Sequence, residues 1–340
     1  MQPFEWVTVR SEAEAANAGA TTVAAAMATP AVGRDAHVLK AGGIDLLNLM
    51  KQDLLRPRRV VNLRGVNGLD RIVEENDGVL RIGVLATLAQ VAQHPLVRDR
   101  YGALADAAGN LASPQIRNVA TLGGNLLQRP QCWYFRSAQH VCARKGGDTC
   151  FAFGGENQYH AIFEQNGCAI VQPSTAATAL VALGAVVELI DANETRRQVR
   201  LEDFYVRPDQ DVHRENDLKP GELLAAGLLP KPAAGTRSVH LKQGEKDSFD
   251  WPLADVAVAL RCNADGSCED ASIVLGAAAP APYRARAAER ALKGKPLQDA
   301  TARAAARAAL EGATPLSKNA YKLPIFEALV RRAILAAAQT

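Results

Sequence analysis

The chain has 340 residues, 48% of them hydrophobic, which is enough for two or three domains with their own cores. A formal net charge of +3 and few aromatic residues argue against nucleic-acid binding. The longest apolar run, residues 176–190, is too short to span a bilayer, and six cysteines in this length do not suggest a disulfide scaffold.

The first sixty residues predict a strand, an alanine-rich helix, a strand, a loop and a helix. Residues 37–40 read as a strand that runs into Ala41-Gly42-Gly43, and residues 44–51 have the apolar spacing of a helix. Two glycines between a strand and a helix let backbone N–H groups approach an anion with no side chain in the way. A plain turn also uses such a pair, and the pattern is not the G-x-G-x-x-G fingerprint of a Rossmann fold.

A second glycine pair strengthens the case for a nucleotide cofactor. Short strands are predicted at residues 59–63, 72–75 and 79–85, with a hairpin turn at 76–78, and helices at 88–93 and 104–110. Gly123 and Gly124 then follow residues 113–120, which are rich in side chains that form hydrogen bonds. Two glycine loops from separate parts of the chain could hold one diphosphate from both sides.

Four cysteines follow the second glycine loop in one segment: Cys132, Cys142, Cys150 and Cys168. Their spacings lack the paired C-x-x-C of common zinc modules, whereas an iron–sulfur cluster needs only four thiolates that converge in space. Four basic residues in the segment would offset the thiolate charge and lower cysteine pKa values: Arg129, Arg136, Arg144 and Lys145. Structural zinc and four unligated core cysteines stay open as alternatives.

The rest of the chain predicts a separate domain. Strands are expected at residues 239–243, 254–261 and 272–277, and alanine-rich segments from residue 284 onward predict three helices. Residues 228–232 are the expected boundary into this domain. Cys262 and Cys268 flank a turn at residues 264–266 and are expected to be free thiols, with a bond across the hairpin as the alternative.

The six histidines lack metal-ligand spacing, and we interpret them as structural: His37, His94, His140, His160, His213 and His240. His140, two residues before Cys142, is the one candidate for a substitute ligand.

Three segments carry a resemblance to a known family: residues 40–47 (KAGGIDLL), residues 114–126 (PQIRNVATLGGNL), and Lys242 with the later Ala-Asp-Val-Ala at 254–257. Together they resemble the FAD-binding subunit of the xanthine dehydrogenase (molybdenum hydroxylase) family over nearly the whole chain. The cysteine segment is absent from most of that family. It is similar to one in 4-hydroxybenzoyl-CoA reductase and, more closely, in periplasmic aldehyde oxidoreductase FAD subunits, where it holds a [4Fe–4S] cluster.

The resemblance implies an α+β fold of the PCMH type, which is vanillyl-alcohol-oxidase-like and has two subdomains that together hold FAD. They would span residues 1–58 and 59–230, the second with an iron–sulfur insert at about 128–170. A C-terminal domain of the CO-dehydrogenase-flavoprotein type, with a three-stranded antiparallel sheet and a helical bundle, would span residues 235–338.

The resemblance also implies the cofactor contacts. The [4Fe–4S] ligands would be Cys132, Cys142, Cys150 and Cys168. The FAD contacts would be Lys40, Ala41, Gly42, Gly43, Ile44, Asp45, Leu46, Gln115, Arg117, Asn118, Thr121, Gly123, Gly124, Asn125, Leu127, Ser174, Lys242 and Phe249.

Two departures from the family pattern concern these contacts. Ser174 is followed by threonine where close relatives have aspartate, so any carboxylate role at that position is lost. Phe249 or Trp251 would lie against the flavin ring, with a core position as the alternative. Lys242 and Lys246 would meet the FAD phosphates, unless they are ordinary solvated lysines.

By resemblance, a molybdenum-cofactor large subunit would oxidise an aldehyde or N-heterocycle, and a [2Fe–2S] small subunit would relay electrons to this chain. FAD would pass them to oxygen, a quinone or a ferredoxin. The extra cluster would relay electrons, adjust the redox properties of the flavin or stabilise a subunit contact. The chain alone would have no catalytic residues for the organic substrate. The competing function is a zinc-stabilised binding or assembly module without redox chemistry.

The N-terminus has no basic region followed by an apolar stretch, so the sequence itself predicts a cytoplasmic protein without direct membrane insertion. Export to the periplasm would need a partner that carries a signal.

Overall fold

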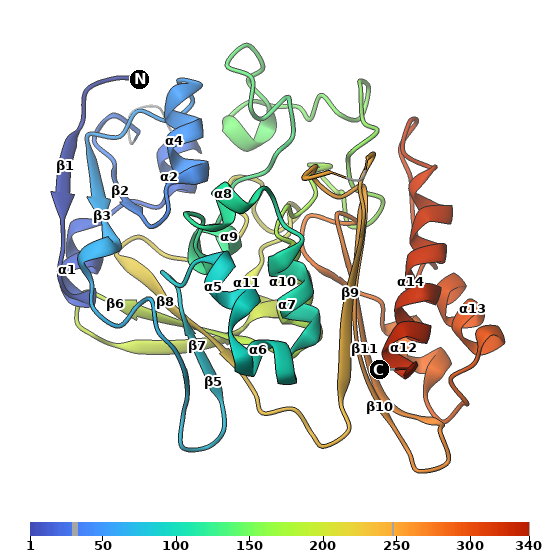
Figure 1. Cartoon of the computed structure of the whole chain (residues 1–340). Helices are drawn as coiled ribbons and strands as arrows, with labels where there is room; N and C mark the ends of the chain where they lie inside the picture. The colour runs from blue at the N-terminus through green and yellow to red at the C-terminus, as the bar shows by residue number, and fades with distance from the viewer. Residues whose placement is uncertain (29–32, 247, 340) are drawn as a thin grey trace.

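A computed structural model describes residues 1–28, 33–246 and 248–339, and its first layer is a small parallel sheet. The sheet has the order β1-β3-β2, formed by β1 (Glu5–Thr8), β3 (Arg59–Asn62) and β2 (His37–Lys40). The helices described between its strands are α1 (Glu12–Ala18), α2 (Val23–Ala28) and α4 (Ile44–Lys51). Val38, Val60 and Leu49 are fully buried between this sheet and α4. The layer forms one end of the molecule (Figure 1).

The second layer is an antiparallel sheet with the strand order β4-β5-β8-β6-β7. Its strands are β4 (Ile72–Glu74), β5 (Leu80–Gly83), β8 (Glu222–Leu229), β6 (Val186–Asp191) and β7 (Arg196–Arg200). The helices that accompany it are α5 (Leu88–Gln93), α6 (Pro95–Arg100), α7 (Gly102–Gly109), α8 (Pro114–Arg117), α9 (Leu122–Leu126), α10 (Thr175–Ala182) and α11 (Leu201–Phe204). All residues of α10 are buried, because this helix packs against α7 and against two strands of the third layer.

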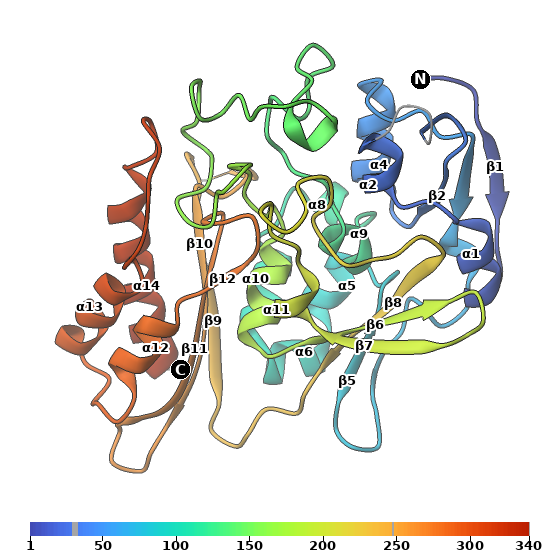
Figure 2. The same ribbon diagram turned by 180° about the vertical axis from the view of Figure 1, so that it is seen from behind.

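The third layer is an antiparallel sheet with the order β12-β11-β10-β9. Its strands are β9 (Arg237–Gln243), β10 (Ala254–Cys262), β11 (Cys268–Gly276) and β12 (Tyr283–Arg284). Its outer face is covered by α12 (Arg286–Leu292), α13 (Asp299–Ala308) and α14 (Lys322–Gln339), as Figure 2 shows. The sheet is therefore buried between these helices and α7 and α10 of the second layer.

The segment from residue 127 to residue 174 runs from α9 to α10 and packs against both outer layers. Within the described residues it contains only one short helix, η2 (Ala143–Lys145). Phe135 and Cys142 pack into the core of the first layer, whereas Ile162 and Phe163 pack into the core of the third. In Figure 1 this green segment lies above α8 and α9.

Several predicted elements differ in detail from the structure. The helix predicted at residues 104–110 begins at Gly102, and the third layer has a fourth strand, the two-residue β12. The helices α8, α9 and α11 have four or five residues each, too few for a 3.6-residue apolar period to be recognised. A short 3₁₀ helix, η1 (Leu63–Gly65), also follows β3.

Cys262 and Cys268 lie opposite each other in the pairing of β10 with β11, and both are free thiols. None of the described helices has both the length and the apolar character needed to cross a membrane.

Candidate functional site

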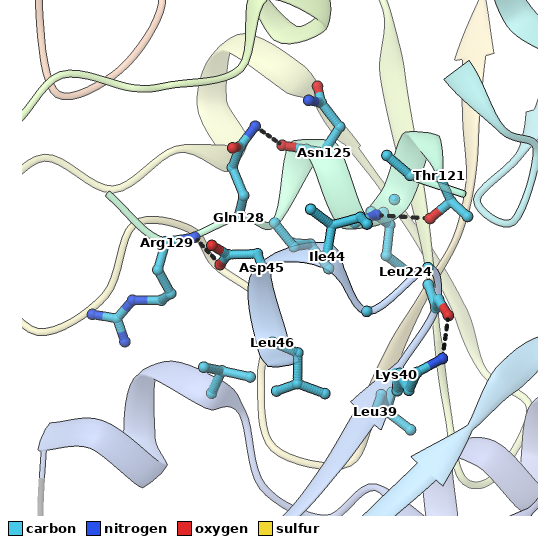
Figure 3. A pocket seen from close by; sticks show the side chains of 18 of the residues that line it. Leu39, Lys40, Ile44, Asp45, Leu46, Thr121, Asn125, Gln128, Arg129 and Leu224 are labelled. Atoms are coloured by element: carbon cyan, nitrogen blue, oxygen red, sulfur yellow. Dashed lines mark hydrogen bonds between the residues drawn. The ribbon is translucent and has the colours of Figure 1, made fainter. Parts of the chain in front are cut away.

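The main candidate site is a cavity of about 350 Å³ where the first layer meets the second. Both glycine loops line it, the first between β2 and α4 and the second at the start of α9. Figure 3 shows Lys40, Ile44 and Asp45 of the first loop on the same cavity as Thr121 and Asn125 of the second. Its volume lies within the range of roughly 300–1,000 Å³ typical of small-molecule and cofactor sites.

The first loop approaches the second so closely that only glycine fits. A Cβ atom at Gly42 would lie 2.3 Å from the carbonyl oxygen of Val119. Gly43 has a φ of 86°, a left-handed conformation that other residues rarely adopt, and it is the N-cap residue of α4. Lys40 is buried beneath the loop, and its Nζ donates to the carbonyl of Ala41 at 3.2 Å. Burial lowers the pKa of Lys40.

The second loop is held by side chains on each side of it. The backbone N–H of Gly124 donates to Oγ1 of Thr121 at 3.2 Å, and a Cβ atom at Gly123 would lie 2.6 Å from Cβ of Val84. Asn125 is fixed by Ser174, whose Oγ donates to Oδ1 of Asn125 at 2.6 Å. These contacts fix the conformation of the loop and use the backbone N–H groups of both glycines, since that of Gly123 donates to the carbonyl of Val84 at 2.9 Å.

Most of the predicted FAD contacts come together on this cavity. Those that line it are Lys40, Ala41, Gly42, Gly43, Ile44, Asp45, Leu46, Thr121, Gly123, Gly124, Asn125 and Leu127. Those that do not line it are Gln115, Arg117, Asn118, Ser174, Lys242 and Phe249.

The six predicted FAD contacts that do not line the cavity lie on the surface or form hydrogen bonds elsewhere. Gln115 and Asn118 are exposed at α8, while Arg117 donates to the carbonyl of Leu111 at 3.0 Å. Nζ of Lys242 donates to the carbonyl of Asn110 at 2.8 Å. Ser174 reaches the cavity only through Asn125, as described above. Phe249 is 60% exposed and Lys246 is also exposed, whereas Trp251 does line the cavity.

Sequence reasoning missed two lining segments, residues 19–24 before α2 and residues 214–224 leading into β8. Neither contains a glycine pair or a recognisable motif, and their position follows only from the tertiary fold. Glu215 is the most informative of these residues, because it belongs to a buried network of charges.

This network extends from the large cavity to the cysteines. Oδ2 of Asp45 accepts from the backbone N–H of Arg129 at 2.9 Å, and Nε of Arg129 lies 2.9 Å from Oε2 of Glu215. Nη1 of Arg144 donates to the other oxygen of Glu215 at 2.7 Å, and the positive charge of Arg144 also acts on the thiol of Cys168. Burial alone would lower the pKa of Arg144, but the Glu215 and Cys168 charges outweigh it and raise that pKa.

One small cavity of about 10 Å³, which we call the thiol cavity, is lined by the four cysteines of the segment: Cys132, Cys142, Cys150 and Cys168. The cavity has room for about one water molecule. Cys150 and Cys168 form a hydrogen bond with each other, and Sγ of Cys132 lies 3.2 Å from Nε2 of His160. Among the described residues, no group of three or more His, Cys, Asp or Glu side chains is arranged to hold a metal ion. The thiols are thus close together, but they do not form a ready-made metal site.

The thiols differ in acidity. Burial raises the pKa of Cys132 to about 11. The hydrogen bond from Cys150, with help from Arg144, lowers the pKa of Cys168 to about 6, so Cys168 is the thiol most easily deprotonated. Burial lowers the pKa of His160 to about 4 and keeps its ring neutral.

Two histidines of the segment differ from what the sequence predicted about which of them lies near the cysteines. His160, interpreted as structural from the sequence, lines the thiol cavity, whereas His140, the candidate substitute ligand, does not line it. Nδ1 of His140 instead lies 2.9 Å from Oγ of Ser137.

Two family models match the chain. Residues 2–232 match the FAD binding domain in molybdopterin dehydrogenase, and residues 239–337 match the CO dehydrogenase flavoprotein C-terminal domain.

Individual proteins of known name are similar to the chain over most of its length. The chain is 36% identical to the aldehyde oxidoreductase FAD-binding subunit PaoB of Escherichia coli K12 over 285 residues, 83% of this chain and 86% of that protein. It is 28% identical to the nicotinate dehydrogenase FAD-subunit of Eubacterium barkeri over 258 residues, 76% of this chain and 72% of that one. A solved carbon monoxide dehydrogenase chain from Hydrogenophaga pseudoflava superimposes with a TM-score of 0.73 and 26% identity, covering 100% of this chain and 99% of that one.

Proposed function

The chain belongs to the family of FAD-binding medium subunits of molybdenum hydroxylases, and we propose that it binds FAD in the large cavity and delivers electrons through it to an external acceptor. One observation supports this placement above the others: two glycine loops, about eighty residues apart in the sequence, line the same cavity. Their residue types suit a diphosphate, because backbone N–H groups can approach it without a Cβ atom between them.

We assign the FAD contacts to this chain's own residues as follows. Gly42 and Gly43 would bind the diphosphate through the backbone. The N–H groups of Gly123 and Gly124 already donate to Val84 and Thr121, so these two glycines would instead let the diphosphate lie close against the backbone. Lys40, partly desolvated under the first loop, would add positive charge near it. Bound FAD supplies a carrier that accepts and donates electrons singly or in pairs. The protein orients it and excludes water.

We further propose that Cys132, Cys142, Cys150 and Cys168 ligate a [4Fe–4S] cluster. Two observations support the fit: four thiols line one cavity, and Arg144 provides positive charge beside Cys168. The cavity is much smaller than a cluster, so binding would require the thiols to move apart and the contact between Cys132 and His160 to open. A resident cluster would add a second one-electron carrier close to the flavin.

The partners proposed are a large subunit with the molybdenum cofactor and a small [2Fe–2S] subunit. The relatives include medium chains of carbon monoxide dehydrogenases, which are by name parts of larger complexes. We propose that residues 1–58 and 59–230 form the two FAD-binding subdomains, and residues 235–338 the C-terminal domain. A zinc-stabilised module without redox chemistry is not favoured by these relatives.

The test is the absorption spectrum and metal content of the chain purified without oxygen. FAD binding predicts flavin absorption bands that disappear on reduction, and the cluster predicts equal iron and acid-labile sulfide. Zinc with a featureless spectrum would contradict both proposals, whereas flavin without iron would contradict only the cluster.

A further inference from the structure

We call the 350 Å³ cavity proposed for FAD the FAD cavity. A second cavity, of about 240 Å³, lies between it and the thiol cavity, and we call it the middle cavity. Gln131 and Trp251 line both the middle cavity and the FAD cavity. Cys132 and His160 line both the middle cavity and the thiol cavity. A molecule bound there would therefore be next to both proposed redox groups.

Aromatic rings form much of the wall of the middle cavity. Trp133, Tyr159 and Trp251 line it, and the rings of Trp133 and Tyr159 meet edge to face with centroids 5.5 Å apart. Flat apolar walls of this kind favour a planar ring as ligand. The volume lies below the roughly 300–1,000 Å³ of drug-sized sites, so the ligand would be limited to about one or two fused rings.

The middle cavity also offers an unused hydrogen-bond donor. Gln172 is 4% exposed and lines the cavity, and its Oε1 accepts from the backbone N–H of Ser174 at 3.2 Å. This contact leaves Nε2 as the free end of the amide, and Nε2 has no hydrogen-bond partner among the described residues. A buried donor without a partner costs roughly 1–3 kcal/mol. A carbonyl oxygen on the ligand would satisfy it.

The charges around the middle cavity exclude anions. Glu245 and Asp250 line it, whereas no lysine or arginine is among the described residues that do so. The Glu245 carboxylate accepts a hydrogen bond from the Tyr159 hydroxyl, and Asp250 accepts one from Ser248 at 2.7 Å. Lys242 donates to the backbone carbonyl of Asp250 but does not line the cavity. Dinucleotides and phosphates would therefore meet two carboxylates and no lining cation, so a neutral ligand fits best.

We propose that the middle cavity binds a small quinone as the electron acceptor, an inference that rests on the proposed flavin function. A quinone is planar and neutral, and one of its carbonyl oxygens would accept the hydrogen bond from Gln172. The quinone takes two electrons from the reduced flavin and two protons from solvent, its two C=O groups become C–OH groups, and it leaves as the hydroquinone.

The test uses duroquinone, whose four methyl groups leave no ring position open to attack by the cysteines. Calorimetry on the purified full chain gives its Kd, and flavin absorption of the same sample gives the FAD content. Gln172→Leu removes the donor and should raise the Kd about three- to tenfold. Tyr159→Leu, at a partly exposed position, should weaken binding without endangering the fold. Gln198→Leu makes the first change at an exposed position on β7 and should alter nothing.

The outcomes separate this proposal from the proposed function. A sample that contains FAD but binds duroquinone equally well in wild type, Gln172→Leu and Tyr159→Leu overturns the quinone site and leaves the flavin function standing. Loss of FAD in Tyr159→Leu as well as in Gln172→Leu would show that the middle cavity belongs to the flavin and would overturn the quinone site. Tighter binding of the two-ring cation 1-methylquinolinium than of duroquinone would rule out the neutral class. A chain that never contains FAD contradicts the proposed function, whether or not it binds duroquinone.

Discussion

Arg144 donates a hydrogen bond of 2.7 Å from Nη1 to Oε1 of Glu215, and both side chains are almost fully buried. Because Arg129 approaches the other oxygen of the same carboxylate, two buried guanidinium groups share the Glu215 carboxylate. The three residues connect the wall of the FAD cavity with Cys168 of the thiol cavity.

Replacing Glu215 by glutamine should lower the free energy of unfolding by about 3–5 kcal/mol, since two buried positive charges would lose their partner. Denaturant unfolding measures this change. Glu327→Gln breaks an exposed pair with Arg307 and should cost less than about 1 kcal/mol. Equal effects of the two substitutions would contradict a special role for the buried pair.

Gly124→Val should abolish most FAD binding without unfolding the chain. An added Cβ atom there meets only Oγ1 of Thr121, at 3.2 Å, so the side chain would extend mainly toward the ligand. A branched side chain that holds the diphosphate away from this wall should cost several kcal/mol, or at least about a hundredfold in affinity. Flavin content after gel filtration is the measurement. The control is Gly154→Val, where an added Cβ meets nothing within 4 Å. Full FAD content in Gly124→Val would remove this loop from the site.

Serine at any of the four proposed cluster ligands should sharply reduce iron and acid-labile sulfide, because iron prefers a thiolate to a hydroxyl. Variants of the other two cysteines, Cys262→Ser and Cys268→Ser, should keep the iron content of the wild type. Iron that followed Cys268 and ignored Cys168 would show that the ligand assignment is wrong.

Stability should rise with pH through the titration of Lys322. Burial lowers the pKa of its ammonium group from 10.5 to about 7, although Asp255 opposes the shift. Between these two values the unfolded chain binds more protons than the folded chain, so the free energy of unfolding increases with pH, by at most about 1.4 kcal/mol per unit. The cost of burying the charge is fully present below pH 7.

Unfolding midpoints in urea from pH 7 to pH 9 test this, with Lys322→Met expected to flatten the slope and exposed Lys295→Met expected to keep it. An unchanged slope in Lys322→Met would assign the pH dependence to another group.

The isolated chain should not dehydrogenate aldehydes or N-heterocycles, because its site would hold FAD and no molybdenum cofactor. Activity with an artificial acceptor should require both proposed partner subunits. Turnover of an organic substrate by the purified chain alone would contradict the subunit model.

The glycine loops could be predicted from sequence because their residue types are dictated locally. At Gly43 the left-handed backbone conformation requires glycine, and the strand and helix on either side have clear apolar periods. The cysteines could be counted but not placed, since their segment is almost without regular structure. Glu215 and Gln172 gave no signal at all, because what distinguishes them is the tertiary neighbourhood of each.

Residues 127–174, the segment that contains the four cysteines, form hydrogen bonds with the C-terminal part of the chain. The backbone carbonyls of His160 and Ala161 accept hydrogen bonds from Asn319, and Lys322 donates to that of His160 as well. The carbonyl of Ile162 accepts from the backbone of Thr314. These donors lie beyond residue 239, in the part of the chain that matches the second family model. The two matched regions are thus separate as sequence families but joined by hydrogen bonds, and we expect a fragment ending near residue 232 to leave the cysteine segment without these contacts.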